Sequence, residues 1–490
     1  MVSLSTVTEE ARIAARALAD FGSDLLNPTL RIGVTGLSRA GKTVFITALV
    51  HNLIRGGRLP VFEAMAQGRI ASARLEPQPD DAVPRFDYET HLASLLEHRT
   101  WPQSTRRVSE LRLVITYQGA KSGARENTLT LDLVDYPGEW LLDLPLLDTD
   151  YATWSAETIR RSREAPRAKL AGRWHAHLGA LHADQPADEK ESRIAAEHFT
   201  ENLRACRDER FAMSLLPPGR FLMPGDLEGS PALTFSPLEL PHNGRTRSRS
   251  LGAMMERRFE AYKNHIVRPF FREHFARLDR QIVLIDALAA FNSGPQAVQE
   301  LERSLGAILD CFRIGRASWL SSLFRPRIDR ILFAATKADH LHHTSHDRLE
   351  NILGHMVRRA TNRAKFEGAL VDVIALSAVR ATREATVERG GERLPSIIGT
   401  PEAGEHAGAE TFDGKTETAM FPGDLPETAD AFFAPEATFK GLSDASRHDT
   451  DYRFLRFRPP VARGSGSLSA TLPHIRLDRA LQFLIGDRLA

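Results

Sequence analysis

The chain has 490 residues, of which 42% are apolar, so it is long enough for two to four domains or for one core with large insertions. The formal net charge is +1, so bulk charge argues neither for nor against a nucleic-acid partner. Two cysteines, Cys206 and Cys311, exclude a disulfide-dense scaffold and fit a reducing compartment.

Residues Met1 to Asn27 predict an amphipathic helix, not a signal peptide, because they lack a continuous apolar segment. No stretch approaches the roughly 18 apolar residues that a membrane-spanning helix needs. We therefore expect a cytoplasmic protein, and peripheral contact with a membrane stays open.

Apolar segments rich in Val, Ile and Leu predict six β-strands. They are Leu30 to Thr35, Glu110 to Tyr117, Thr128 to Val134, Gln281 to Ile285, Arg330 to Ala335 and Val371 to Leu376. Most show no clean alternation of polar and apolar residues, which is typical of strands buried on both faces of a parallel sheet. Helical patterns lie between several of them. The sequence therefore predicts an α/β fold with a doubly wound, mostly parallel sheet.

Two stretches interrupt the alternation of strands and helices. One is rich in Arg, Glu, Ala and Leu and predicts a large helical insertion; the other, rich in Gly, Pro, Thr and Phe, predicts a C-terminal insertion of loops and short β-strands. The predicted order is an N-terminal helix (1–29), the first part of the core (30–150), the helical insertion (151–275), the second part of the core (276–390), the loop and short-strand insertion (391–470) and a final core helix (471–490).

The first motif, Gly36-x-x-x-x-Gly41-Lys42-Thr43, lies between a predicted strand and a predicted helix. Glycines allow successive N–H groups to turn toward phosphates, and the helix N-terminus adds a favourable dipole. Lys42 supplies positive charge for the β- and γ-phosphates, and the Thr43 hydroxyl is a ligand for Mg²⁺. The residues predicted to contact the nucleotide here are Gly36, Ser38, Arg39, Ala40, Gly41, Lys42, Thr43 and Val44.

The second motif, Asp135-Tyr136-Pro137-Gly138, follows a predicted apolar strand. Asp135 is expected to hold the Mg²⁺ shell, and the Gly138 N–H to contact the γ-phosphate. The loop before the second strand should supply a further hydroxyl for Mg²⁺. Thr105 is preferred because it lies nearest that strand, and Thr100 and Ser104 are the other candidates.

The third motif, Thr336-Lys337-Ala338-Asp339, matches the guanine-reading pattern Asn/Thr-Lys-x-Asp. The Asp339 carboxylate can accept hydrogen bonds from the N1–H and 2-amine of guanine, donors that adenine lacks, and Lys337 can lie over the base. Ser377 and Ala378 follow the next strand, where a backbone N–H would meet the guanine O6. All four motifs follow strand ends, where open α/β sheets bind ligands.

These motifs in this order resemble the Ras-like GTPases, and three phrases resemble the stress-induced, Ras-like YcjX family of bacteria. The phrases are Gly33 to Thr43, Asp135 to Trp140 and Trp101-Pro102. The resemblance covers nearly the whole chain. It implies GTP and GDP binding with Mg²⁺, GTP hydrolysis, a bacterial cytoplasmic setting, a link to stress and an inner-membrane partner; the helical insertion is a candidate surface for a protein partner.

Two residues depart from the wider Ras-like pattern. Thr336 stands where Asn is usual, and Glu139 stands where many relatives place a water-orienting Gln. Because the Glu139 charge beside a γ-phosphate is unfavourable, intrinsic hydrolysis should be slow, or the catalytic group comes from elsewhere. The alternatives to a GTPase are an ATPase and a nucleotide-gated binding module with negligible turnover.

Two clusters of charged or titratable residues are interpreted as solvated surface residues and not as binding sites. The histidines after Asp339 are interpreted as a solvated loop, not a metal site; they are His340, His342, His343 and His346. Arginines between Arg245 and Arg280 alternate with acids, so they predict a solvated helix face and no nucleic-acid partner. An arginine of this stretch, such as Arg257 or Arg258, is a candidate for acting on the nucleotide.

Overall fold

The computed structural model describes most of the chain. The described ranges are 29–37, 39–78, 80–103, 107–120, 126–208, 213, 215–241, 246–311, 328–366, 368–389, 391–407, 410–433, 452–461 and 471–490. The predicted N-terminal helix and three candidate site residues, Ser38, Ser104 and Thr105, lie outside them.

The centre of the molecule is a seven-stranded sheet with the strand order β2-β3-β4-β1-β5-β6-β7. Its strands are β1 (Thr29–Gly36), β2 (Ile70–Glu76), β3 (Ser109–Gln118), β4 (Glu126–Asp135), β5 (Arg280–Ile285), β6 (Arg330–Ala335) and β7 (Leu370–Ala375). Strands β4, β1, β5, β6 and β7 run parallel, whereas β2, β3 and β4 pair antiparallel. This order is typical of P-loop nucleotide-binding proteins, so the predicted fold class is confirmed.

The six predicted strands form, but β2 was not predicted. β2 is an edge strand that carries Arg74 and Glu76 and is largely exposed, so it lacks the apolar density of the buried strands. In contrast, every residue of β5 is buried. Ile282 and Leu284 pack on one face of the sheet, and Val283 and Ile285 pack on the other, as the period of two requires.

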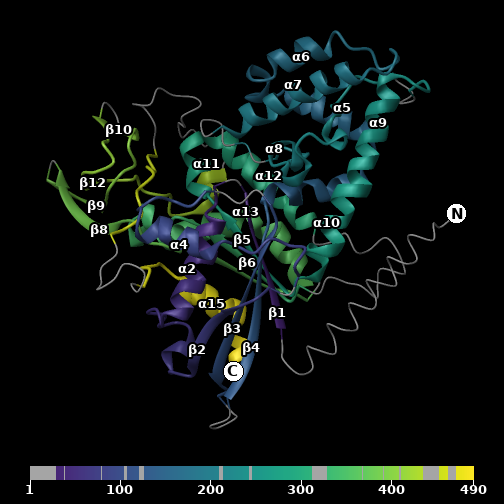
Figure 1. Ribbon diagram of the computed structural model, residues 1–490. Helices are drawn as coiled ribbons and strands as arrows, with labels where there is room; N and C mark the ends of the chain where they lie inside the picture. The colour runs from purple at the N-terminus through teal and green to yellow at the C-terminus, as the bar shows by residue number, and fades with distance from the viewer. Residues whose placement is uncertain are drawn as a thin grey trace.

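Helices cover both faces of the sheet (Figure 1). The helices of this core are α2 (Lys42–Ile54), α3 (Glu63–Ala66), α4 (Tyr88–Leu96), α11 (Ala287–Ser293), α12 (Pro295–Cys311), η8 (Ala338–His340), η9 (His343–Ser345), α13 (His346–Phe366), α15 (Leu477–Ile485) and η11 (Gly486–Leu489). α2, α4 and α15 bury their apolar side chains against one face, and α12 and α13 against the other. Both faces of the sheet are therefore covered by buried apolar side chains.

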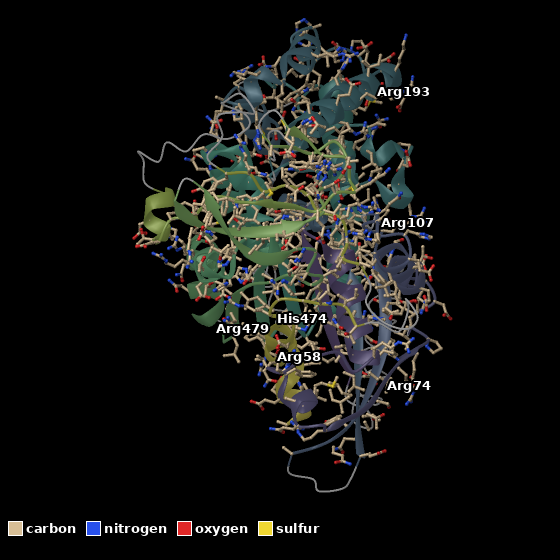
Figure 2. All side chains as sticks on the ribbon, turned by 90° about the vertical axis from the view of Figure 1, so that its left-hand side faces the viewer. Arg58, Arg74, Arg107, Arg193, His474 and Arg479 are labelled. Carbon is tan, nitrogen blue, oxygen red and sulfur yellow. The ribbon has the colours of Figure 1, made fainter. Side chains whose placement is uncertain are left out.

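A helical region (138–277) extends away from the sheet, with α5, α6, α7 and α9 farthest out (Figure 1). Its elements are η1 (Gly138–Asp148), α5 (Tyr151–Ser162), η2 (Arg167–Lys169), α6 (Gly172–Leu178), α7 (Glu189–Arg207), α8 (Gly219–Leu222), η3 (Gly225–Leu227), η4 (Pro231–Leu233), α9 (Leu251–Tyr262), η5 (Lys263–Val267), α10 (Arg268–Glu273) and η6 (Phe275–Arg277). Figure 2 shows Arg193 of α7 toward the opposite end of the molecule from Arg74. The buried apolar side chains of this region join those under the sheet in one continuous cluster.

A C-terminal segment (383–461) forms a second, smaller layer beside the sheet (Figure 1). Its elements are β8 (Arg383–Arg389), β9 (Glu392–Gly399), β10 (His406–Ala407), β11 (Glu410–Thr411), β12 (Thr418–Met420) and α14 (Ala429–Phe433). β8 pairs with β9 and β9 with β12, so this layer begins before the predicted boundary at residue 391. Its own buried cluster consists of Ile397, Phe412, Leu455 and Phe457.

The chain then returns to the sheet through residues 471–490. Ser377 and Ile475 exchange backbone hydrogen bonds in both directions (3.0 and 2.8 Å). Figure 2 shows His474 beside Arg58, and His474 Nε2 donates to the Arg58 carbonyl oxygen at 2.9 Å. Among all described helices, none is both long enough and apolar enough to cross a bilayer. At the other end of α15, Arg330 Nη1 donates to the Phe483 carbonyl oxygen at 2.7 Å, so this helix is held by the core at both ends.

Candidate nucleotide site

The predicted phosphate cradle lies between β1 and α2. A β-carbon on Gly36 would lie 2.4 Å from the Leu284 carbonyl oxygen, so only glycine fits at this strand end. The Ala40 N–H donates to the Leu37 carbonyl oxygen at 3.1 Å, which closes the turn. Gly41 has a φ of 82°, which glycine adopts without strain, and α2 begins at the next residue. The first N–H groups of α2 thus face the loop.

The charged and hydroxyl side chains of this loop are close to its backbone. Lys42 Nζ donates to the Gly36 carbonyl oxygen at 2.9 Å, so the ammonium group folds over the loop. Thr43 is buried at the start of α2, and the partly buried Val44 packs against the core. Arg39 adopts a left-handed φ of 63°. The loop before the N-terminus of α2 is thus held by its own backbone and by Lys42.

The second motif leaves the sheet beside this loop. Asp135 is the last residue of β4, is fully buried and aligns with Val34 of β1. A β-carbon on Gly138 would lie 2.3 Å from the Gly36 carbonyl oxygen. The two loops are therefore in backbone contact, which only glycine permits. A ligand that moves one loop would also move the other.

Glu139 follows Gly138 at the start of η1 and is only 6% exposed. Its Oε1 lies 3.7 Å from Nη1 of Arg207, the last residue of α7. The backbone of Glu139 also contacts the helical region, because a β-carbon on Gly219 would lie 2.1 Å from its carbonyl oxygen. The predicted water-orienting position is therefore enclosed by the helical region and has a counter-charge there.

The third and fourth motifs meet at the ends of β6 and β7. The Asp339 carboxylate accepts from Ser377 Oγ at 2.7 Å and from the Ala381 N–H at 2.8 Å. Lys337 has a φ of 61°, and its Nζ forms an ion pair with Asp286, which follows β5. Both carboxylates, that of Asp339 and that of Asp286, are thus fixed before any ligand binds.

Ala378 and Thr336 complete this end of the sheet. Ala378 is partly buried against the core next to Ser377. The Thr336 N–H donates to the Ile285 carbonyl oxygen at 2.9 Å, and its hydroxyl lies 3.3 Å from the same oxygen. Threonine in place of the usual Asn therefore still anchors the loop to the neighbouring strand.

A cavity of about 360 Å³, a size common among small-molecule sites, lies between the first motif and Lys337 of the third, although Asp339 and Ser377 are not among its lining residues. Its floor carries Leu37 and Arg39 of the first loop, Glu139, Asp286, Lys337 and His340. The helical region contributes Arg207, Met213, Leu216 and Leu222 to its walls, and the C-terminal segment contributes Gly404 to His406 and Tyr452 to Arg456. The arrangement can enclose a phosphate chain at one end and a planar base at the other.

The histidines after Asp339 do not form one solvated loop, so that interpretation was wrong for two of them. His340 and His346 are buried, and burial lowers the pKa of each, which keeps the rings neutral. His346 Nε2 donates to the Ala338 carbonyl oxygen at 2.8 Å, which supports the third motif. Of the other two, His342 is partly buried and His343 is exposed, and His343 Nδ1 lies 2.8 Å from a Glu384 oxygen.

The two arginines proposed from the sequence do not line the cavity. Arg258 is buried between helices, where it pairs with Glu189 and donates to the Thr234 carbonyl oxygen at 3.0 Å. Arg257 is exposed on α9. Arg207 was missed because nothing in its local sequence distinguishes it. Asp286 was also missed, although its position directly after a buried strand is the same signal that identified Asp135.

A buried carboxylate links η1 to the helical region. Asp143 accepts from the Gly219 N–H at 2.6 Å and from the Tyr262 hydroxyl, and Arg220 lies nearby. Desolvation outweighs these contacts and raises the pKa of Asp143 to about 7. The guanidinium of Arg220 lies 3.1 Å from the centre of the Trp140 ring, next to Glu139 in the chain. The segment after Gly138 is thus bonded to α8 and α9.

Comparison with known proteins agrees with this geometry. The profile of the YcjX-like family, DUF463, matches residues 30–489. A protein of Escherichia coli (strain K12) described as "Ras-like GTPase YcjX" is 36% identical over 474 residues, which cover 94% of this chain and 96% of that protein. A protein of Shewanella oneidensis with the same description is 34% identical, with 100% of this chain and 99% of that protein covered. The resemblance seen in the motifs is confirmed.

Proposed function

This chain belongs to the YcjX-like family, and from that premise we propose that it binds GTP and hydrolyses it to GDP and phosphate as a molecular switch. The description of both relatives as Ras-like GTPases supports a guanine nucleotide. The observation that carries the proposal is one cavity lined both by Leu37 and Arg39 of the phosphate cradle and by Lys337, two residues before the Asp339 that bonds to Ser377.

Guanine recognition is assigned to Asp339. Each oxygen of its carboxylate already accepts one hydrogen bond, from Ser377 Oγ or from the Ala381 N–H. A carboxylate offers about four acceptor positions, so two remain for the N1–H and 2-amine of guanine. The existing bonds fix the plane of the carboxylate, which reduces the entropy lost on binding. The ion pair with Asp286 holds Lys337 for contact with the base.

Phosphate binding is assigned to the N–H groups of Gly36 to Val44 and to Lys42 Nζ. On binding, Lys42 Nζ would give up its hydrogen bond to the Gly36 carbonyl oxygen and donate to phosphate oxygens instead. The oxygen donors Thr43, at the start of α2, and Asp135, at the end of β4, fit Mg²⁺, which prefers hydroxyl and carboxylate ligands. Bound there, Mg²⁺ would supply positive charge against the β- and γ-phosphates. Thr105 is outside the described residues and stays a predicted ligand.

The switch is assigned to Gly138. Its backbone touches Gly36, so a γ-phosphate in the cradle would meet the Gly138 N–H and displace or hold the start of η1. From η1 the change would pass to the helical region through Asp143 and its partners Gly219 and Tyr262. The helical region is thus the surface on which a partner would read the nucleotide.

Hydrolysis by the chain alone is expected to be slow. Glu139 can accept a hydrogen bond from water, but its charge beside the γ-phosphate opposes the reaction. This feature also favours a second candidate function, a nucleotide-gated binding module with negligible turnover. The family resemblance further supports a cytoplasmic location, a link to stress and a partner at the inner membrane.

Affinity for different nucleotides tests the base assignment. Asp339→Asn should weaken GTP binding at least tenfold, about 1.4 kcal/mol, because an amide NH₂ would face the donors of guanine. The variant should prefer xanthosine triphosphate, which carries a carbonyl in place of the 2-amine. Calorimetry with GTP, ATP and xanthosine triphosphate measures this. Equal affinities of the parent for GTP and ATP, unchanged in the variant, would support the ATPase alternative.

Lys42 and turnover test the rest of the proposal. Lys42→Ala should lose most GTP affinity while its circular dichroism matches that of the parent, because Lys42 Nζ contacts only the loop among the bonds described. Phosphate release under saturating GTP then separates an enzyme from a binding module. Binding without any release above the background rate of GTP would favour the module.

A further inference from the structure

Arg207 occupies an unusual position at the phosphate end of the cavity. It is the last residue of α7 and lines the cavity together with Leu37 and Arg39 of the P-loop. Its side chain is 32% exposed, but its Nη1 is buried and has no hydrogen-bond acceptor among the described residues. A buried donor without an acceptor costs about 1–3 kcal/mol, so this arrangement requires an explanation.

The contact with Glu139 does not satisfy Arg207. The distance from Nη1 to Glu139 Oε1 is 3.7 Å, beyond the 2.7–3.2 Å range of N–H···O hydrogen bonds. The ion pair therefore gives attraction without a hydrogen bond. A guanidinium keeps its charge at every physiological pH and offers several donors in one plane. Such a group suits an acceptor with several oxygens, and a phosphoryl group is one.

The position of Glu139 locates this guanidinium relative to the nucleotide. Gly138, the preceding residue, touches the P-loop at the Gly36 carbonyl, beside the phosphate cradle. Arg207 thus lies next to Glu139, the residue that follows Gly138, and the Gly138 N–H is the group that a γ-phosphate would meet. Of the other arginines that line the cavity, Arg456 pairs with Glu405 at 2.6 Å, whereas Arg220 and Arg258 lie outside the lining, over the Trp140 ring and beside Glu189.

We propose that Arg207 is a catalytic arginine supplied by the helical region, which turns from Glu139 to the γ-phosphate of bound GTP. This rests on the proposed GTPase function. The oxygen of a water molecule attacks the γ-phosphorus, the bond to the β–γ bridging oxygen breaks, and its electron pair leaves with GDP while the water protons go to the phosphate. Arg207 donates to the γ-phosphoryl and bridging oxygens, where negative charge grows.

Glu139 is then a positioning residue for Arg207. Before GTP binds, its carboxylate holds the guanidinium at the edge of the cavity. Once Arg207 contacts the phosphate, that carboxylate is released to accept a hydrogen bond from the attacking water. In this arrangement Glu139 stands where the usual Gln would be, and Arg207 supplies the positive charge near the γ-phosphate.

Single-turnover hydrolysis of bound GTP tests the proposal. Arg207→Ala should reduce the rate at least about 100-fold, while GTP and GDP affinities change less than about threefold. Arg207→Lys should recover part of the rate, because it keeps the charge but not the planar donors. The matched control is Arg204→Ala, which removes an exposed arginine from the same helix and should hydrolyse at the parent rate.

Two further measurements separate catalysis from a structural role. GDP with aluminium fluoride mimics the transferring phosphoryl group, and Arg207→Ala should lose this complex while still binding GDP. In a Glu139→Gln background, Arg207→Ala should still slow hydrolysis; no effect there would show that Arg207 serves only as a counter-ion and would overturn the proposal. An equal rate in parent and Arg207→Ala would also overturn it. A parent that binds GTP without hydrolysis would instead reject the proposed enzyme and, with it, this role.

Discussion

The helical region and the C-terminal segment both line the cavity, but they are attached to the sheet in different ways. Buried aromatic and aliphatic side chains run without interruption from the helical region to the sheet. The C-terminal segment contributes only Leu425 and Phe454 to the buried residues of that cluster, and its Ile397, Phe412, Leu455 and Phe457 form a separate small cluster. Hydrogen bonds also tie it to the core, such as those between Asn292 and the backbone of Phe454 and the 2.6 Å bond from Trp101 Nε1 to the Phe457 carbonyl.

This difference indicates how the helical region and the C-terminal segment would each respond to a bound nucleotide. A continuous core moves or unfolds as a unit, so events at Gly138 should reach the far helices of the helical region. A segment with a small core and a few hydrogen bonds can open locally at little cost to the rest. We therefore expect the helical region to transmit a signal and the C-terminal segment to control access to the cavity.

The largest expected effect comes from removing residues 477–490, which return the chain to the core after the C-terminal segment. Leu481 and Leu484 cover the sheet, and Asp487 pairs with Arg280, whose side chain is fully buried. Their loss exposes the sheet and leaves the buried Arg280 with only one of its two carboxylate partners, Asp329. We expect insoluble or unfolded protein by soluble yield and circular dichroism.

Asp487→Asn is the matched control for this deletion, because it weakens the ion pair of Arg280 and keeps the helix. It should be soluble but less stable. A folded, nucleotide-binding protein without residues 477–490 would show that the C-terminal segment, not α15, completes the core.

Trp154→Ala should have the next largest effect, because Trp154 stacks on Phe259 at 5.0 Å deep in the helical region. Loss of a buried aromatic ring costs about 3–5 kcal/mol. Since the core is continuous, chemical denaturation should show one transition at a lower midpoint. Two transitions, with the sheet unfolding at the parent midpoint, would mean that the helical region is an independent unit.

The buried carboxylate of Asp143 gives a pH-dependent effect. Its folded-state pKa of about 7 lies above the ordinary 3.8, so folding takes up a proton between these values and stability falls as pH rises through this window. Asp143→Asn mimics the protonated acid and should raise the free energy of unfolding at pH 8 by roughly 1–3 kcal/mol. The gain should vanish near pH 4. Asp148→Asn, at an exposed position of the same helix η1, is the control, and an equal gain from it would refute this explanation.

The smallest effect on global stability is expected from Phe457→Ala in the C-terminal segment. Phe457 packs in the small cluster and against His340 at 5.3 Å. We expect a change within about 0.5 kcal/mol in the unfolding of the sheet, with faster hydrogen exchange confined to β8 and β9. If this variant destabilised the protein as much as Trp154→Ala does, the two regions would not differ as described.

The parts of the molecule that could be predicted from sequence are those encoded locally. Apolar runs gave the buried strands, and the motifs at their ends, from Gly36 to Ser377, converge because parallel strands end at the same edge. β2 was missed since its charged edge hides the pattern, and Arg207 and Tyr452 were missed since their approach to the cavity depends on how two long insertions pack. No local spacing encodes that packing. The lining residues that belong to the motifs were therefore predictable, and those from the two insertions were not.

The exchange of backbone hydrogen bonds between Ser377 and Ile475 has a consequence for the synthesis of the protein. A ribosome completes the P-loop early and the Asp339 loop later, but the loop of Ser377 gains its partner only when Ile475 has emerged. Arg380, whose N–H donates to the Pro473 carbonyl at 2.7 Å, waits for the same stretch. Chains fold as they emerge. Selectivity for guanine should thus appear only after the stretch from Pro473 to Ile475 has been synthesised, well after the P-loop.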